Sequence, residues 1–194
     1  TVAVPVTVPY VRYSTLGAHS FIGQALEALV QASGVPKAQI DGLCLSSFSL
    51  APDTAVGVTQ HMGLSPRWLD HVPTGGASGV MCLRRAARAV QAGDADVVAC
   101  VAADTNHVDS FRQTLGAFSN FARDATYPYG SGGPNSIFAF ITANYMRISG
   151  AAREDFGRIA VDQRSNALDN PNAMFKKPLT LDEYMGARPI SAPL

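Results

Sequence analysis

The sequence predicts an α/β fold built on a mostly parallel β-sheet, and three observations support this prediction. Apolar segments of strand length alternate with segments whose apolar residues recur at helical spacing. A glycine-rich turn, residues 73–79, joins one such strand directly to a helix. The chain has 194 residues, of which 47% are hydrophobic, so it can bury the core of one α/β domain. Alternating strands and helices call for right-handed crossovers and therefore for parallel strands.

The N-terminal segment combines an extended start with a helix. Residues 2–10 are rich in β-branched side chains but include Pro5 and Pro9, which predicts an edge strand or a partly irregular segment. Residues 19–30 repeat apolar positions at helical spacing, so we expect a helix there. Gly34 is typical of the residue that follows a helix, so this helix should end beside it.

A strand and a second helix come next. The apolar segment 40–47 predicts a strand. Asp53 or Thr54 can cap a helix that runs to about Met62, because their side-chain oxygens can accept hydrogen bonds from its first N–H groups. Gly63 then predicts the end of this helix.

A strand, the glycine-rich turn, a helix and another strand complete the predicted sheet. Residues 68–72 have the character of a short strand, residues 80–90 have helical periodicity, and a further strand surrounds Val97. Ligands of such sheets bind beyond the carboxyl ends of the strands. We expect Gly76 and the segment 104–107 to lie at that edge of the sheet.

The chain changes character after the sheet. Residues 105–134 are polar and aromatic with clusters of glycine, which is the composition of a long covering loop. Helices are then predicted over about residues 135–148 and 153–167. Residues 170–188 form another predicted loop stretch, with a short helix near 181–185.

The glycine-rich turn carries the most chemical information. Its glycines permit positive φ angles and close approach of the backbone, and the N–H groups at a helix start favour a thiolate or an oxyanion. Such a turn suits acyl chemistry. Within it, Gly76-Ala77-Ser78-Gly79 resembles the Cys-Ala-Ser-Gly turn of the thiolase superfamily, in which the cysteine takes up an acyl group from coenzyme A. Gly76 stands at the cysteine position, and glycine cannot be acylated.

Further segments extend this resemblance along the chain, in family order from about residue 25 to residue 194. They are similar to the thiolases of the sterol-carrier-protein or lipid-transfer-protein type. The segments are residues 94–104, 127–130, 144–147, 162–167, 170–173 and 177–184.

The resemblance implies a thiolase-like N-terminal domain over residues 1–194, with a sheet core over about residues 1–104 and an inserted loop domain over about residues 105–188. The family's histidine motif and second cysteine motif belong to a C-terminal half that this sequence lacks. The family also implies a homodimer formed through a sheet-edge contact. A coenzyme A ester is implied as substrate or ligand, with no covalently bound cofactor.

Three residues are candidates for the chemistry. Gly76 marks the vacant nucleophile position. Ser78 is a candidate substitute, but a serine needs a base within hydrogen-bond reach, so a helix-capping or packing role is the stronger hypothesis. Its backbone N–H can still contribute to binding an oxyanion. His107 follows the last predicted strand and is a candidate for ligand contact or proton transfer.

A second group of candidates frames the glycine cluster at residues 130–133, where a loop enters a predicted helix. An N-terminus of this kind can meet an anionic group, but a purely structural turn is the stronger hypothesis. The candidates for contact with an acyl-CoA or a partner are Tyr127, Tyr129, Gly130 and Asn135.

Composition argues against several function classes. Fifteen basic and fifteen acidic side chains cancel, so the chain has no net field that would recruit nucleic acid or an anionic membrane. Its four histidines lack metal-ligand spacing, which argues against zinc or iron. No apolar run approaches the roughly 18 residues of a membrane span. Cys44, Cys82 and Cys100 lack CxxC spacing and lie in apolar segments, which predicts buried thiols and a cytoplasmic protein.

Arg84, Arg85 and Arg88 cluster on the predicted helix after the turn. A solvated helix face is the main hypothesis for this cluster, and contact with a nucleotide phosphate or a partner is the alternative.

Three functional hypotheses follow. The first is an acyl-CoA-handling enzyme of lipid or sterol metabolism that works without an acyl-enzyme. Relatives of this kind include retro-aldolase-type C–C lyases that act beside an acyl-CoA-binding partner subunit. The second is an acyltransferase whose thiol comes from elsewhere in the fold. The third is a non-catalytic acyl-CoA-binding or scaffolding subunit of a thiolase-like complex.

Overall fold

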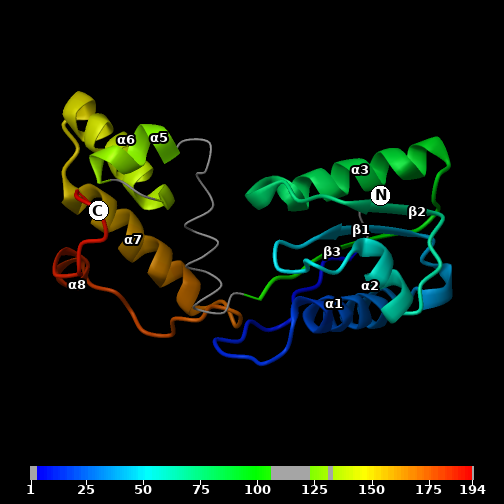
Figure 1. The fold of residues 1–194 in the computed structure, drawn as a ribbon. Coiled ribbons are helices and arrows are strands. Elements are labelled where there is room, and N and C mark those ends of the chain that lie inside the picture. The colour runs from blue at the N-terminus through cyan, green and yellow to red at the C-terminus, as the bar shows by residue number, and fades with distance from the viewer. Residues whose placement is uncertain (1–3, 106–122, 131–132, 194) are drawn as a thin grey trace. The chain divides into compact units, whose positions relative to one another are not determined.

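The computed structural model describes residues 4–105, 123–130 and 133–193, shown as coloured ribbon in Figure 1. The chain divides into two compact units, Thr1–Asn106 and His107–Leu194. Predicted site residue His107 lies outside the described residues.

A parallel β-sheet forms the centre of the first unit. Its described strands are β1 (Gly42–Ser46), β2 (Trp68–His71) and β3 (Val98–Ala102), in the order β2-β1-β3. Gly42 of β1 lies opposite Trp68 on one side and Val98 on the other, and all three strands run in the same direction. The predicted α/β fold with a parallel sheet is therefore confirmed. β1 is the central strand, and its five residues are all buried.

One face of this sheet is covered by α1 (Ala18–Ser33) and α2 (Ala55–His61), as Figure 1 shows. The main core lies between these helices and the sheet and includes Ile22, Leu43 and Leu45. The sequence signals at the helix ends are confirmed. Gly34 ends α1 in the left-handed region at φ 69°, and the Thr54 hydroxyl caps α2 by accepting the Gly57 N–H at 3.2 Å. Thr54, not Asp53, is thus the cap.

The opposite face is covered by α3 (Ser78–Ala92). A smaller core lies under this helix and includes Cys44, Val72 and Cys82. The helix starts two residues before the first position that its apolar periodicity predicted, and Gly93 ends it at φ 81°. The early start has a local cause, because the Ser78 side chain is tied to the preceding turn.

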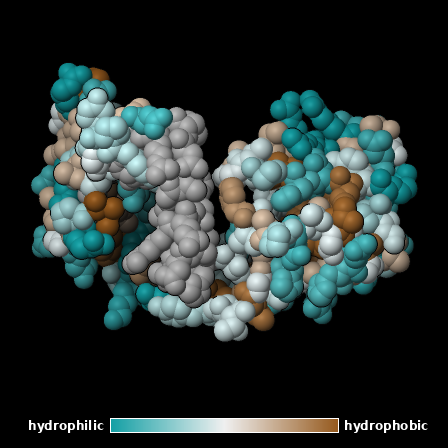
Figure 2. Space-filling model, in the orientation of Figure 1, coloured by the Kyte–Doolittle hydropathy of each residue, from teal (hydrophilic) through white to brown (hydrophobic). Residues whose placement is uncertain are grey.

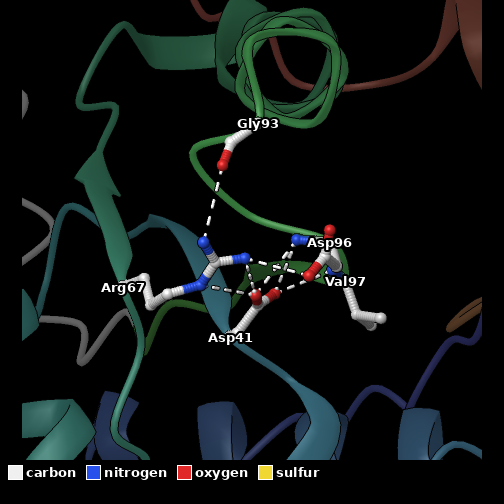
Figure 3. Close-up of polar contacts among 5 residues, drawn as sticks. All are labelled: Asp41, Arg67, Gly93, Asp96 and Val97. Carbon is white, nitrogen blue, oxygen red and sulfur yellow. Dashed lines mark hydrogen bonds and ion pairs between the residues drawn. The ribbon is translucent and has the colours of Figure 1, made fainter.

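The amino edge of the sheet is held by a polar cluster around Asp41 (Figure 3). The Asp41 carboxylate accepts the N–H groups of Asp96 and Val97 at 2.9 and 2.8 Å, and the Arg67 Nη2 donor at 2.6 Å. Arg67 also reaches the Asp96 carboxylate at 3.0 Å and the Gly93 carbonyl at 3.5 Å. The Val97 N–H and the Arg67 guanidinium lower the pKa of Asp41 to about 2.

The N-terminal residues before α1 take the irregular alternative that their two prolines allowed. Residues 4–17 form no helix or strand in the structure. Pro5 and Pro9 have no N–H to donate to a sheet, which explains this outcome.

The second unit is helical in its described part. A short helix α5 (Arg123–Thr126) and a 3₁₀ turn η4 (Tyr127–Tyr129) precede α6 (Gly133–Ser149) and α7 (Arg153–Leu168). The prediction of a covering loop over residues 105–134 is wrong at residues 123–129. Pro128 has a preset φ that suits a tight turn, and Gly130, at φ 73°, ends it.

Helix α8 (Leu181–Met185) occupies the residues predicted for a short helix. A capping box fixes its start, because the Thr180 hydroxyl accepts the Glu183 N–H and the Glu183 carboxylate accepts the Thr180 N–H. The helix packs on α7 at Gly157, and the Arg153 guanidinium donates to the Met185 carbonyl at 3.2 Å. Among the described residues, no helix is both long and apolar enough to cross a bilayer.

Candidate functional site

The glycine-rich turn lies between β2 and α3, at the carboxyl edge of the sheet. Gly75–Ala77 form a 3₁₀ turn, and the Ser78 N–H donates to the Gly75 carbonyl. Gly75 has a φ of 70°, in the left-handed region where a side chain would be strained. Gly76 is different, because its φ is not positive and a Cβ added to it would meet no atom within 4 Å. Gly76 therefore has room for a side chain.

Ser78 fastens this turn to the helix. Its side chain is 4% exposed, and its oxygen accepts the Thr74 N–H at 3.1 Å and lies 3.3 Å from the Thr74 hydroxyl. In the described part of the chain, Thr74 is its only side-chain hydrogen-bond partner, and no histidine or carboxylate is placed to activate it. This geometry favours the packing role for Ser78, whose side chain holds the preceding turn and caps no N–H group of α3. The first N–H group of α3, that of Ser78, is already donated to the Gly75 carbonyl.

A second loop lies at the same edge, directly after β1. The Asp104 carboxylate, which follows β3, holds this loop through one oxygen. Its Oδ1 accepts the Ser47 hydroxyl at 3.0 Å, the Phe48 N–H at 2.6 Å, and both the N–H and the hydroxyl of Ser49 at 2.9 Å. The Ser49 hydroxyl in turn accepts the Thr105 N–H at 2.8 Å. Asp104 thus joins the ends of two neighbouring strands, at the edge where the sequence placed it.

The loop after β1 also lies against the glycine-rich turn. A Cβ added to Gly75 would lie 3.7 Å from Cζ of Phe48, so the Phe48 ring borders the turn. His71, at the end of β2, has its Nε2 3.3 Å from the Ser47 carbonyl. The sequence analysis did not identify Ser47, Phe48 or Ser49. A signal was present, because polar residues follow a fully buried strand at the edge where ligands bind.

The three cysteines come together beneath α3. Cys44 and Cys100 are neighbours in register on β1 and β3, and Cys82 packs against Cys44 from α3. Cys44 and Cys82 are buried, as predicted, whereas Cys100 is partly buried. The hydrogen bond with Cys100 and burial raise the pKa of Cys44, and burial raises the pKa of Cys82. The hydrogen bond with Cys44 lowers the pKa of Cys100. Cys44 and Cys82 are therefore held as neutral thiols.

The arginines of α3 divide into two kinds. Arg85 forms an ion pair with Asp70 of β2 at 2.8 Å, and the hydrogen bond that the guanidinium donates to this carboxylate raises the pKa of Arg85. Arg84 and Arg88 are exposed, as predicted for a solvated face. Figure 2 shows hydrophilic and hydrophobic surface mixed over the visible face of this unit, and Val80, Leu83 and Val90 of α3 are also exposed.

The remaining candidates belong to the second unit. Tyr127, Tyr129 and Gly130 form one turn, in which the Gly130 N–H donates to the Tyr127 carbonyl at 3.0 Å, and both tyrosines are exposed. Asn135 is exposed in the first turn of α6. Their contact with an acyl-CoA stays a prediction, as does the role of His107. In the described ranges, no group of three or more histidine, cysteine or acidic side chains is arranged to hold a metal ion.

No family model matches the sequence. The chain is 32% identical over 178 residues to the 17-hydroxy-3-oxo-4-pregnene-20-carboxyl-CoA lyase of Mycobacterium tuberculosis, covering 87% of this chain and 45% of the lyase. It is 32% identical over 181 residues to the steroid side-chain-cleaving aldolase of Thermomonospora curvata, covering 88% and 46%. Identity to the acetyl-CoA acetyltransferase of Methanocaldococcus jannaschii is 27% over 191 residues, covering 94% and 48%.

Among solved structures, the Ltp2-ChsH2(DUF35) aldolase superposes with a TM-score of 0.77 at 30% sequence identity. The match covers 93% of this chain and 47% of the aldolase chain. The chain spans about half the length of the curated relatives that it matches.

Proposed function

The homologues of this chain are steroid side-chain-cleaving aldolases and thiolase-like proteins, and on this premise we propose that it is part of a thiolase-like enzyme that cleaves a carbon–carbon bond in an acyl-CoA ester. The reaction is a retro-aldol cleavage in lipid or sterol breakdown. Gly76 is the observation that carries the proposal. A retro-aldol reaction needs no acyl-enzyme, so it tolerates glycine where thiolysis requires a cysteine.

The chemistry balances without a further reactant. A base removes the proton from a hydroxyl group on the β-carbon of the acyl chain, and the Cα–Cβ bond then breaks. The β-carbon leaves as a carbonyl compound, the bonding electrons pass to the thioester as an enolate, and a proton returns to Cα. The substrate in the name of one relative carries both a hydroxyl group and a carboxyl-CoA ester, as this reaction requires.

In this proposal the turn binds the thioester oxygen. Negative charge develops on that oxygen as the bond breaks, and N–H groups at the start of a helix stabilise such charge. The N–H groups proposed here are those of Gly76 and of the residues after Ser78, because the Ser78 N–H already donates to the Gly75 carbonyl, and the Ser78 side chain holds the turn through Thr74. A base and a proton donor for the carbon–carbon step come from outside the turn, and His107 is the candidate that this sequence offers.

Residues of the second unit and a partner are separate parts of this proposal. Tyr127, Tyr129, Gly130 and Asn135 contact the coenzyme A ester. The protein forms a homodimer and works beside an acyl-CoA-binding subunit. Support for a partner comes from two relatives, since one is named as a two-protein aldolase and another as the thiolase subunit BbsB.

The test uses the complete native protein and a CoA ester with a tertiary β-hydroxyl group. Mass spectrometry should detect the ketone and the shortened acyl-CoA in equal amounts. Treatment of the native protein with iodoacetamide should leave this cleavage unchanged, because no thiol takes part. Thiolysis of acetoacetyl-CoA that disappears on alkylation would instead show an acyltransferase with a cysteine from elsewhere.

A non-catalytic acyl-CoA-binding subunit is the second candidate, and the missing nucleophile favours it directly. Calorimetry that detects acyl-CoA binding with no cleavage of any β-hydroxyacyl ester would support this alternative. A Gly76→Cys variant adds a separate measurement, because the space around Gly76 accepts a side chain. Gain of acetoacetyl-CoA thiolysis in this variant would show that the rest of a thiolase site is intact.

A further inference from the structure

A single carboxylate oxygen, Oδ1 of Asp104, accepts all four of the hydrogen bonds that tie the loop Ser47–Ser49 to this residue. Oδ1 of Asp104 accepts two backbone N–H groups and two hydroxyl groups from three consecutive residues, at distances of 2.6 to 3.0 Å. Hydrogen bonds to an ionised carboxylate are about twice as strong as those between neutral groups. The shortest of the four is to the N–H of Phe48, so Asp104 fixes the backbone of Phe48 most directly.

The side chain of Phe48 lies beside the turn. It is 51% exposed, although a phenyl ring gains free energy when it leaves water. Its Cζ would lie 3.7 Å from a Cβ added to Gly75, an ordinary van der Waals distance, so the ring borders the turn. An apolar ring thus stands next to the backbone that carries the proposed oxyanion-binding N–H groups. A bound thioester would have its oxygen at those groups and its acyl carbons within reach of the ring.

We propose that Phe48 is a specificity-determining residue that contacts the acyl group of the bound CoA ester, and that Asp104 is the positioning residue that holds it there. This inference rests on the proposed function, because it takes the turn to be the thioester site. A phenyl ring offers no hydrogen bond, so it selects by apolar contact. The acyl groups favoured are bulky aliphatic or alicyclic ones, and a two-carbon acyl group gains little.

The test measures the binding of CoA thioethers that cannot be cleaved, so its result does not depend on whether the protein is a lyase. The complete native protein and its variants are titrated by calorimetry with two unreactive thioethers, S-hexyl-coenzyme A and S-methyl-coenzyme A. Phe48→Ala should weaken the binding of S-hexyl-coenzyme A by about tenfold. This is the low end of the range for losing an apolar contact in a pocket. Binding of S-methyl-coenzyme A should change by less than about twofold. Phe48→Tyr keeps the ring and should keep the wild-type ratio.

Asp104→Asn tests the positioning role. The substitution removes the negative charge that holds the loop Ser47–Ser49. It should lower the affinity for S-hexyl-coenzyme A relative to that for S-methyl-coenzyme A, as Phe48→Ala should. Asp94→Asn is the matched control, since Asp94 precedes β3 at the opposite edge and should leave the ratio unchanged. A role in stability alone would lower the melting temperature without changing the ratio. If Asp104→Asn fails to fold, the two Phe48 variants still decide the assignment of the ring.

The outcomes distinguish this inference from the proposed function. An unchanged hexyl-to-methyl ratio in Phe48→Ala overturns the inference, even if the wild-type protein cleaves β-hydroxyacyl-CoA. A wild-type protein that cleaves none of these esters but loses chain-length discrimination in Phe48→Ala overturns the lyase proposal and keeps the acyl contact. Absence of binding by either thioether to the wild-type protein overturns both.

Discussion

Replacing Gly157 by alanine should destabilise the second unit, although alanine is the better helix former. Gly157 is buried in α7 where α8 packs against it. An added Cβ would lie 2.6 Å from Cδ1 of Leu181 and 2.7 Å from Cδ1 of Tyr184, closer than real contacts allow. The Leu181 methyl group can rotate away. The Tyr184 ring cannot do so easily, because the Arg153 guanidinium lies 5.5 Å from its centroid.

The expected magnitude comes from two opposing effects. Glycine to alanine in an open helix stabilises by about 1 kcal/mol, and overpacking a filled contact costs about 1–3 kcal/mol. Gly157→Ala should therefore lower the free energy of unfolding by about 0–2 kcal/mol. Gly79→Ala is the matched control, since a Cβ on Gly79 in α3 would meet nothing within 4 Å. It should raise the free energy of unfolding by up to about 1 kcal/mol.

The assay is urea unfolding of the complete native protein, followed by far-ultraviolet circular dichroism. The two variants should differ in free energy of unfolding by about 1–3 kcal/mol, with Gly157→Ala the less stable. The slope against urea should stay the same, so that the midpoints alone report the difference. Equal stabilisation by both substitutions would refute the reasoning. It would mean that Leu181 and Tyr184 move away from the added Cβ without any loss of stability.

Four further predictions follow from other parts of the structure. The pKa of Asp41 is lowered from its ordinary value of 3.8 to about 2 in the folded state, so the stability that the ionised carboxylate contributes is present above pH 3.8 and is lost as the pH falls toward 2. Asp41→Asn should therefore flatten the dependence of the melting temperature on pH between these values. An unchanged dependence in this variant would contradict the geometry. Leu45→Ala, at a fully buried position in β1, should cost about 2–5 kcal/mol in urea unfolding, and a loss below 1 kcal/mol would mean that the core collapses around the cavity. Thr54→Ala removes the cap of α2 and should cost about 0.5–2 kcal/mol, whereas Thr54→Ser should cost little. Native Cys82 should react with iodoacetamide far more slowly than an exposed thiol, and rapid labelling located by peptide mapping would show that α3 opens.

Local patterns in the sequence were sufficient for most of the helices and strands. Thr54 and Gly34 mark helix ends through interactions within one turn, which are visible in a linear sequence. The start of α3 was misplaced because Ser78 is recruited by a hydrogen bond to Thr74, and the glycines around it show no apolar periodicity. The order of strands and the grouping of the three cysteines depend on long-range pairing, which periodicity does not encode.

The candidate site was predicted only in part. The turn around Gly76 became a candidate because its residues are contiguous and resemble a known motif. The role of Asp104 was missed because its partners Ser47 and Ser49 are more than fifty residues earlier in the chain. Phe48 carried no signal of its own, since an aromatic residue after a buried strand is as easily part of a core. Its significance comes from exposure and from its neighbour Gly75, and both are properties of the folded chain.

The cluster of Asp41, Arg67 and Asp96 stabilises the sheet of the first unit at one edge, and the proposed site lies at the other edge. It links the beginnings of all three strands by side-chain and backbone hydrogen bonds, on the edge away from the proposed site. The sheet thus keeps its alignment through contacts that the loops at the other edge do not share. Side chains in those loops can therefore vary while the contacts at the amino edge still hold the beginnings of the strands together. A library of substitutions in residues 47–49, screened against a panel of CoA esters, would exploit this separation.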